Sequence, residues 1–214
     1  MKLEQEAFGI YHVYNRGVRK DTLFHSNSDY SRFLLLIFML QYTEPVQNIS
    51  RLNKVFSKNL DIKILDQKDK GERLIELLAF CIMPNHFHIL ANQLIEDGLA
   101  KYMQKVLTAY TMYYNKKYKK TGHAFQGKYK KVFVEDDEQL VYTSIYIHKN
   151  SLDVGIEPFS YTWSSLQDLV GDNRWADFLN GRIIMDHYGG DLSKYKTEVI
   201  ESPAKIISKK TIKI

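Results

Sequence analysis

The chain has 214 residues, of which 44% are hydrophobic and 26% are charged, and its net charge at pH 7 is +5. This length and composition fit one packed domain with small additions and exclude a disordered chain. The charged N-terminus is unlike a signal peptide, and no apolar run approaches the roughly 20 residues of a membrane span. A single cysteine, Cys81, excludes an internal disulfide and a cysteine-built zinc site, so we expect a reducing, cytoplasmic location without membrane partners.

The first half of the chain predicts a strand, a helix and a variable segment. Strand-favouring residues at 8–14 end at a turn signal and predict a first strand. Apolar residues at helical spacing predict a helix over residues 27–42, before Pro45. Residues 47–70 are polar and mixed, so they predict either a partner strand, centred on the short apolar stretch at 62–65, or a variable excursion.

The second half predicts the elements that carry the chemistry. Residues 74–90 are apolar and strand-like, with a break at Pro84-Asn85. Helical spacing predicts a long helix beginning at Gly98, and residues 128–134 predict another strand. Acidic residues then open a helix that is expected to run over residues 138–150.

This order of elements predicts an α+β fold of the ferredoxin-like, split βαβ type, with an antiparallel sheet and helices on one of its faces. After Gly155 the elements become short and polar. The basic and partly alternating residues 205–214 predict either an extra edge strand or a basic tail.

The positive charge is concentrated at two places along the chain, where it is interleaved with aromatic residues. Cations suit phosphates and flat rings suit unstacked bases, so this pattern favours a groove for single-stranded nucleic acid, although a solvated lysine-rich loop has the same composition. The side chains that we expect to contact the nucleic acid are Arg16, Arg19, Lys128 and Lys130 for phosphates and Phe125 and Tyr129 for base stacking.

Two spacing patterns single out chemically active residues. His86 and His88 are two apart on a predicted strand, which places both side chains on one face with Cα atoms about 7 Å apart, a chelating geometry that also arises by chance. Tyr142, Tyr146 and Asn150 recur at i, i+4 and i+8 on a predicted helix and share one face. On spacing alone, such a tyrosine stripe also fits a core or interface.

Six further sequence blocks stand out along the chain: Tyr11-His-Val-Tyr-Asn-Arg-Gly17, Ala79-Phe-Cys-Ile-Met-Pro-Asn-His-Phe-His-Ile-Leu90, Ala124-Phe-Gln-Gly-Lys-Tyr129, Val134-Glu-Asp-Asp-Glu138, Tyr146-Ile-His-Lys-Asn150 and Tyr161-Thr-Trp-Ser-Ser165. They occur in the order seen in the single-tyrosine HUH transposases, and they are most similar to the branch called REP-associated tyrosine transposases. The resemblance covers residues 8–171. It predicts one HUH domain over residues 1–171, with residues 172–214 as an extension packed on it or trailing from it.

The resemblance implies a role for each matched residue. His86, His88 and Asn150 fall on the family's ligands for a divalent metal, and Tyr146 falls on its nucleophile, with Tyr142 as the rival. Ligand types alone would admit zinc, iron or nickel, whereas the resemblance implies Mg²⁺ or Mn²⁺. The family usually has proline after the asparagine, where this chain has Ser151, so the predicted helix stop is weaker.

The implied activity is cleavage and rejoining of single-stranded DNA that carries a hairpin, through a covalent 5′-phosphotyrosine. Two alternatives remain: a binding module that recognises hairpins without catalysis, and a metal hydrolase that uses water instead of tyrosine. Relatives act as monomers or as dimers that exchange the tyrosine helix. We expect a monomer, because the connection before the predicted Tyr146 helix is short.

Overall fold

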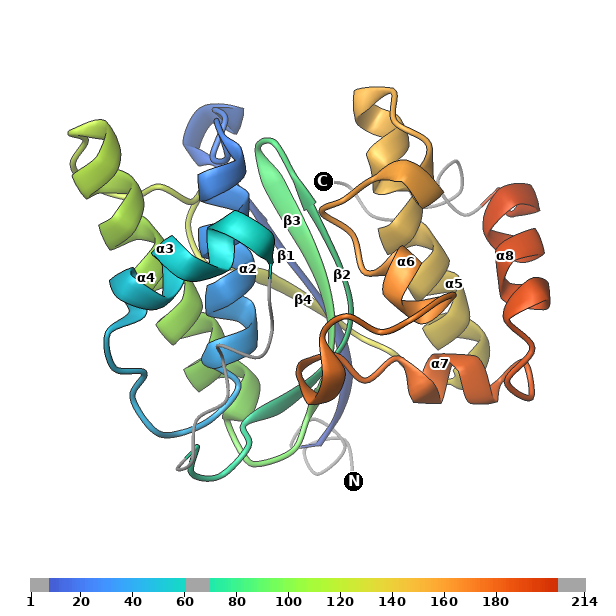
Figure 1. Ribbon diagram of the computed structural model, residues 1–214. Helices are drawn as coiled ribbons and strands as arrows, with labels where there is room; N and C mark the ends of the chain where they lie inside the picture. Colours follow the sequence, from blue (N-terminus) through green and yellow to red (C-terminus); the bar gives the residue numbers. More distant parts are fainter. Residues whose placement is uncertain (1–7, 61–69, 204–214) are drawn as a thin grey trace.

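Four strands in the described part of the chain form one antiparallel sheet with the order β2-β3-β1-β4 (Figure 1). The computed structural model describes residues 8–60 and 70–203. β1 (Gly9–Arg16) lies between β3 (His86–Gln93) and β4 (Lys130–Phe133), and β2 (Ile75–Met83) pairs with the other side of β3. β1 and β2 are both antiparallel to β3 and therefore parallel to each other. This is the split βαβ arrangement, so the predicted α+β, ferredoxin-like class is confirmed.

Helices and short 3-10 turns fill the connections between and after the strands. In the parts of the chain that are described, no helix combines the length and the apolar character that crossing a membrane requires. The helical elements are α2 (Asn27–Met39), α3 (Ile49–Asn59), α4 (Gly98–Tyr118), α5 (Asp137–His148), α6 (Leu166–Leu169), α7 (Arg182–Asp186) and α8 (Leu192–Glu201), with 3-10 turns η1 (Val18–Lys20), η3 (Lys149–Val154), η4 (Pro158–Ser160) and η5 (Ala176–Phe178).

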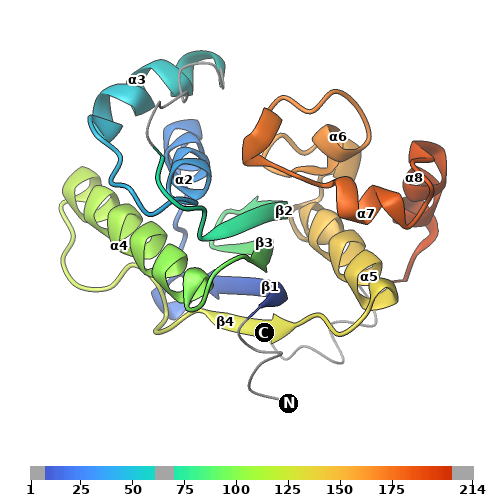
Figure 2. The ribbon, with the colours of Figure 1, turned by 90° about the horizontal axis from the view of Figure 1, so that it is seen from below.

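Helices cover both faces of the sheet, which corrects the prediction of one covered face (Figure 2). α2 and α4 lie on the face that carries Phe87, whose ring centroid is 4.9 Å from that of Phe33 in α2. α5 lies on the opposite face, where the ring of Tyr146 is 5.4 Å from that of His88. Hydrophobic periodicity shows that a helix buries one side, but it does not show which face of the sheet receives it.

Residues 49–59 form α3, a helix that the prediction for residues 47–70, a partner strand or a variable excursion, did not specify. Ile49, Leu52 and Phe56 recur at helical spacing, and Phe56 is fully buried. Arg32 of α2 fixes the start of α3, because its Nη1 donates to the carbonyl of Ile49 at 2.9 Å. The stretch at 62–65 and the alternatives for 205–214 lie outside the described residues.

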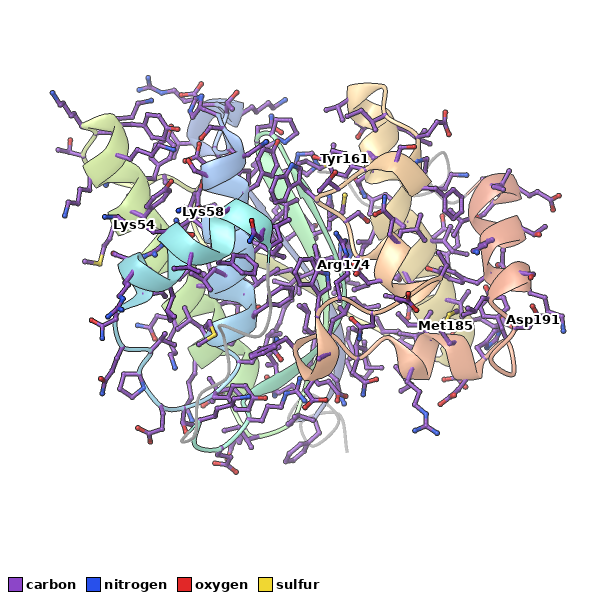
Figure 3. The ribbon with its side chains drawn as sticks, in the orientation of Figure 1. Lys54, Lys58, Tyr161, Arg174, Met185 and Asp191 are labelled. Atoms are coloured by element: carbon purple, nitrogen blue, oxygen red, sulfur yellow. The ribbon has the colours of Figure 1, made fainter. Side chains whose placement is uncertain are left out.

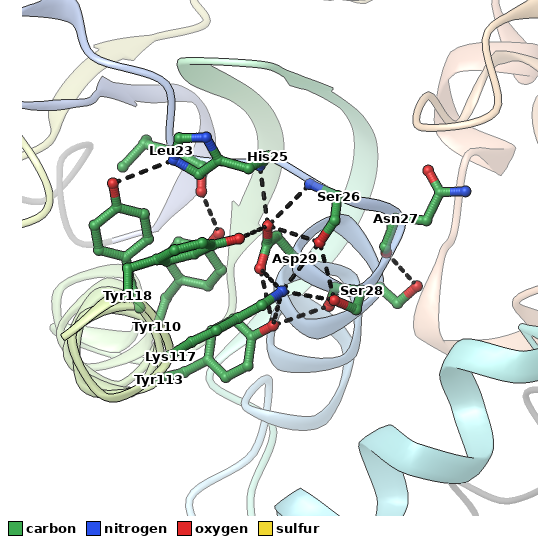
Figure 4. A network of polar contacts seen from close by, with 12 residues as sticks. Leu23, His25, Ser26, Asn27, Ser28, Asp29, Tyr110, Tyr113, Lys117 and Tyr118 are labelled. Atoms are coloured by element: carbon green, nitrogen blue, oxygen red, sulfur yellow. Dashed lines mark hydrogen bonds and ion pairs between the residues drawn. The ribbon is translucent and has the colours of Figure 1, made fainter.

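A buried carboxylate, Asp29, joins the start of α2 to the end of α4 (Figure 4). It is fully buried and accepts from Lys117 Nζ at 2.6 Å, from the Tyr118 hydroxyl at 2.6 Å and from the Tyr113 hydroxyl at 2.9 Å. Two backbone amides just before α2 donate to the same carboxylate. Lys117 therefore has a structural partner, although it belongs to the lysine-rich segment of the sequence.

Replacing Asp29 is expected to destabilise the fold in a pH-dependent way. Burial alone would raise the pKa of Asp29, but hydrogen bonds from Lys117, Tyr118, Tyr113 and Ser26 outweigh it and lower that pKa. The stabilisation is therefore present above about pH 4 and is lost as the pH falls below it. We expect Asp29→Asn to reduce the free energy of unfolding by about 3 kcal/mol at pH 7, and by less at pH 3.

Urea unfolding followed by circular dichroism at the two pH values measures this difference. The control is Asp21→Asn, because Asp21 is an exposed carboxylate in the connection that leads to α2, and its effect should stay within about 0.5 kcal/mol. A loss for Asp29→Asn that is equal at both pH values would contradict the prediction.

Candidate metal and tyrosine site

The two histidines of the predicted chelating pair lie at the start of β3, directly after the turn at Pro84-Asn85. Across the sheet, His86 is opposite Arg16 and His88 is opposite Tyr14, so both histidines lie on the face covered by α5. Their ring centroids are 5.1 Å apart with the planes at 88°. His86 is half-buried and His88 is fully buried. The structure thus brings the two imidazoles together, with one of them reachable from outside.

The Nδ1 atom of each histidine has a neighbour that sets the orientation of its ring. His86 Nδ1 lies 2.7 Å from Asn85 Oδ1, and Asn85 Nδ2 in turn donates to the carbonyl of Lys20 at 3.0 Å. Because the amide oxygen can only accept, Nδ1 of His86 carries a proton, and in the neutral ring the lone pair is then on Nε2. His88 Nδ1 lies 2.9 Å from His12 Nε2. Support of this kind, through the second ring nitrogen, is typical of histidines that bind metals.

His12 is a residue of this site that the sequence analysis did not single out. Burial lowers its pKa to about 3, so its ring is neutral at neutral pH. The ring stacks on that of His88, with centroids 5.1 Å apart and planes at 24°. The sequence did contain a signal for His12: it lies inside the first matched block, two residues before Tyr14 and on the same face of the predicted strand.

Tyr146 projects from α5 onto the histidines of its own chain. Its ring stands edge-on to His88, with centroids 5.4 Å apart and planes at 83°, and to His12 at 5.8 Å and 76°. Only 2% of Tyr146 is exposed. The rival, Tyr142, lies one turn earlier and is half-buried, and burial raises the pKa of its hydroxyl.

Asn150 lies just beyond the end of α5, in η3 and not in the helix itself. Its side chain is buried, and its Nδ2 donates to the carbonyls of Tyr146 at 2.8 Å and Ile147 at 3.3 Å. The amide oxygen is then the atom of this side chain that can serve as a ligand. Within the described ranges no three His, Cys, Asp or Glu side chains gather in a metal-binding cluster. The role of Asn150 as a metal ligand stays a prediction that follows from the resemblance.

The side of α5 that faces away from Tyr146 is held by the C-terminal segments. The Tyr195 hydroxyl of α8 lies 2.9 Å from Ser144 Oγ and 2.8 Å from His148 Nδ1. His148 Nε2 lies 2.9 Å from Ser165 Oγ, and Ser165 Oγ also accepts from the backbone amide of Phe80 in β2 at 2.8 Å. All of these groups are buried. This chain of hydrogen bonds connects α8, α5 and the sheet.

The residues that follow position 171 are anchored to the domain by a buried carboxylate. Asp168 accepts from Arg174 at 2.7 and 2.9 Å and from Trp175 Nε1 at 2.8 Å; Arg174 is labelled in Figure 3. The Trp175 ring is fully buried, 5.1 Å from the ring of Phe38 in α2. The described part of the predicted extension is therefore packed on the domain.

A pocket beside His86 collects three of the cations that the sequence pointed to. Arg16 Nε donates to Gln126 Oε1 at 2.6 Å, and Lys130 Nζ lies 5.8 Å from the ring centre of Tyr14. The pocket is thus basic and polar, and it reaches a histidine of the pair. Its lining consists of Tyr14, Asn15, Arg16, His86, Gln126, Lys128 and Lys130.

The other three predicted DNA contacts have different surroundings. Arg19 is exposed in η1 and does not line this pocket, and Tyr129 is half-buried with Lys128 6.0 Å above its ring. Phe125 is only 4% exposed, and it packs against the rings of Phe33, Phe87 and Tyr110. The prediction that Phe125 stacks on bases is wrong, because a core ring has no open face to offer. Aromatic composition beside lysines does not separate a core ring from a surface ring.

The split βαβ sheet, with a histidine pair beneath the helix that carries Tyr146, agrees with the fold that the resemblance to the single-tyrosine transposases implies. A family model described as IS200-like transposase matches residues 38–150, more than half of the chain, and the chain therefore belongs to this family. The family predicted from the sequence blocks is confirmed.

One solved structure is similar along most of its length. A REP-associated tyrosine transposase bound to a REP hairpin superposes with a TM-score of 0.53 at 12% sequence identity, covering 83% of this chain and 87% of that chain. At this identity the similarity shows the fold alone. No curated protein sequence matches the chain significantly.

The hydrogen bonds of Tyr195 yield a stability prediction. Tyr195→Phe removes the hydroxyl that meets both Ser144 and His148, so two buried polar groups lose a partner. We expect the free energy of unfolding to fall by about 2 kcal/mol and the amides of α5 to exchange faster with solvent.

Urea unfolding and amide hydrogen exchange measure the two effects. Tyr188→Phe is the matched control, because the hydroxyl of Tyr188 bonds to Glu198 at an exposed position, and its effect should stay within about 0.5 kcal/mol. Wild-type stability and unchanged α5 exchange in Tyr195→Phe would show that this contact does not hold the helix.

Proposed function

We propose that the protein is a metal-dependent transposase that cleaves and rejoins hairpin-containing single-stranded DNA through a covalent bond to Tyr146. The observation that carries the proposal is the contact of Tyr146 with His88, beside a histidine that opens into a basic pocket. Membership of the IS200-like transposase family supports the DNA-cleaving activity. The similar fold of a transposase bound to a REP hairpin supports the hairpin substrate.

The donor atoms fit a divalent cation. Two imidazole Nε2 atoms and the amide oxygen of Asn150 leave coordination positions for water and phosphate oxygens. We favour Mg²⁺ or Mn²⁺ because of the resemblance to the HUH transposases. When bound, the metal supplies a Lewis acid that neutralises charge on the phosphate under attack.

The tyrosine performs the covalent step. Tyr146 Oη loses its proton and attacks the phosphorus atom, and the bond from phosphorus to the 3′ oxygen breaks with its electron pair going to that oxygen. The 3′ oxygen takes up a proton and leaves as a hydroxyl, while the 5′ phosphate stays esterified to Tyr146. One phosphoester replaces another, so a 3′ hydroxyl of a second strand can reverse the step without ATP.

The basic pocket has the properties of a path for the DNA backbone toward His86. Arg16, Lys128 and Lys130 place three positive charges around one opening, where phosphates replace counterions. Tyr129, half-buried beneath Lys128, presents an aromatic ring for an unpaired base. Arg19, exposed in η1, extends the positive charge beyond the pocket.

We also propose that one chain suffices for the reaction. Tyr146 touches His88 of the same chain, and the C-terminal segments hold α5 in this place. A monomer that acts in cis therefore has its histidines and its tyrosine together without a second copy.

The burial of Tyr146 favours a second candidate function, a hairpin-binding module without catalysis. Tyr146 is 2% exposed, so an attack on DNA requires its hydroxyl to become accessible when the strand binds. A hairpin-binding module that never uses its tyrosine would show the same burial. A water-using hydrolase would also leave Tyr146 unmodified, so the fate of this residue decides among the three functions.

Covalent capture of DNA tests the mechanism. We expect wild type, mixed with labelled hairpin oligonucleotides and Mn²⁺, to form an adduct that survives denaturation. Tyr146→Phe removes the attacking oxygen and should reduce the adduct by at least about 10³-fold. His86→Ala and chelation of the metal should act in the same direction. Denaturing electrophoresis measures the adduct.

Tyr142→Phe is the matched control, one helical turn away, and should keep the adduct. If Tyr146→Phe still formed the adduct and Tyr142→Phe did not, the nucleophile would be Tyr142. Hairpin binding without any adduct would favour the binding module, and cleaved DNA without an adduct would favour the hydrolase.

The pocket cations should act through salt-dependent binding. Lys128→Ala and Lys130→Ala each remove one phosphate contact, so each should weaken DNA binding and reduce the slope of log K against log salt concentration by about 1. Fluorescence anisotropy of a labelled hairpin at several salt concentrations measures both. The control is Lys101→Ala, because Lys101 is exposed near the start of α4 and does not line the pocket; this variant should keep the affinity and the slope of wild type. Equal losses of affinity in all three variants would contradict a role for the pocket.

A further inference from the structure

His12 touches both groups on which the proposed chemistry depends. It lies in the middle of β1, on the face that α5 covers, and only 2% of it is exposed. Its Nε2 is 2.9 Å from His88 Nδ1, and the Tyr146 ring stands edge-on to its own ring at 5.8 Å. One imidazole thus connects a candidate metal ligand with the candidate nucleophile.

An imidazole at this position is costly unless its polar atoms are used. Burying a polar group without a hydrogen bond destabilises a fold, so an apolar side chain would fill the same space more favourably. The hydrogen bond of His12 is made to His88, whose other ring nitrogen is the one that can bind a metal. The contact therefore points to the site and not to packing alone.

The second histidine of the pair has an orienting partner of the same kind. Asn85 Oδ1 accepts from His86 Nδ1, and the carbonyl of Lys20 fixes the amide of Asn85. In both histidines, Nδ1 is thus occupied by a neighbour that comes from the protein. The two partners differ in chemistry, an amide for His86 and an imidazole for His88.

We propose that His12 is a positioning residue for His88: His12 Nε2 accepts the hydrogen bond of His88 Nδ1–H, which keeps the lone pair of His88 on Nε2 for the metal. The same ring supports the edge of Tyr146, so ligand and nucleophile share one neighbour. This inference rests on the proposed function, because it requires a metal at His86 and His88.

The tautomers of the two rings provide a test on the unmodified protein. Long-range ¹H–¹⁵N correlation spectra of the metal-free full chain report which ring nitrogen carries each proton. We expect His88 to be protonated on Nδ1 and His12 on its own Nδ1, with Nε2 of both unprotonated. The opposite arrangement, with His12 Nε2 donating to His88, would overturn the proposal, since His88 would then carry its proton on Nε2.

Metal affinity provides a second test with a matched pair of variants. His12→Leu removes the acceptor, whereas His12→Gln places an amide oxygen near the position of Nε2. We expect His12→Leu to weaken Mn²⁺ binding by about 10- to 100-fold and His12→Gln to stay within about 3-fold of wild type. The electron paramagnetic resonance signal of free Mn²⁺ measures affinity, and circular dichroism verifies that each variant is folded.

The outcomes separate this inference from the proposed function. Wild-type affinity in His12→Leu, together with loss of binding in His86→Ala, would overturn the role of His12 and leave the metal site intact. Equal weakening in His12→Leu and His12→Gln would also overturn it, since the acceptor would then not matter. If wild type binds no Mn²⁺, both the metal site and the inference fail. If His12→Leu does not fold, His12→Gln and the tautomers still decide.

Discussion

The pairing of β1 with β3 decides which side chains meet beneath α5. In this register His88 lies opposite Tyr14 and His86 lies opposite Arg16, and the next residue along β3, Phe87, points to the other face. A slip by one residue would turn the histidines toward α2 and α4 and would place Phe87 under the tyrosine helix. The site therefore depends first on strand register, which the apolar core on the opposite face enforces.

The tyrosine helix is unusual in being buried on nearly every side. Ile145 and Ile147 are both fully buried, although a spacing of two residues places them on opposite sides of α5. The sheet covers one side of the helix and the segments after Gly155 cover another (Figure 2). The described residues after the last matched block therefore help to hold α5, and with it Tyr146, in place.

The sequence predicted the strands and the long helices closely, because their periodicity and turn signals are local. The spacing of His86 and His88 also predicted their shared face, whereas the roles of Tyr146 and Asn150 came from the family resemblance. The side of the sheet occupied by α5, the burial of Phe125 and the contact of His12 with His88 were not predicted. These features depend on which elements pack together, and composition and spacing within one segment carry no information on that.

The two edges of the sheet are finished in different ways. Along β2, the backbone of Trp163 and Ser165 continues the hydrogen bonding, through Ile82 and Phe80. No strand among residues 8–60 and 70–203 pairs with the outer side of β4. The exposed side chains of β4 include Lys130 and Lys131. Positive charge on an open edge strand opposes its pairing with another molecule. The lysines of β4 therefore disfavour the pairing of this edge with a strand of another molecule.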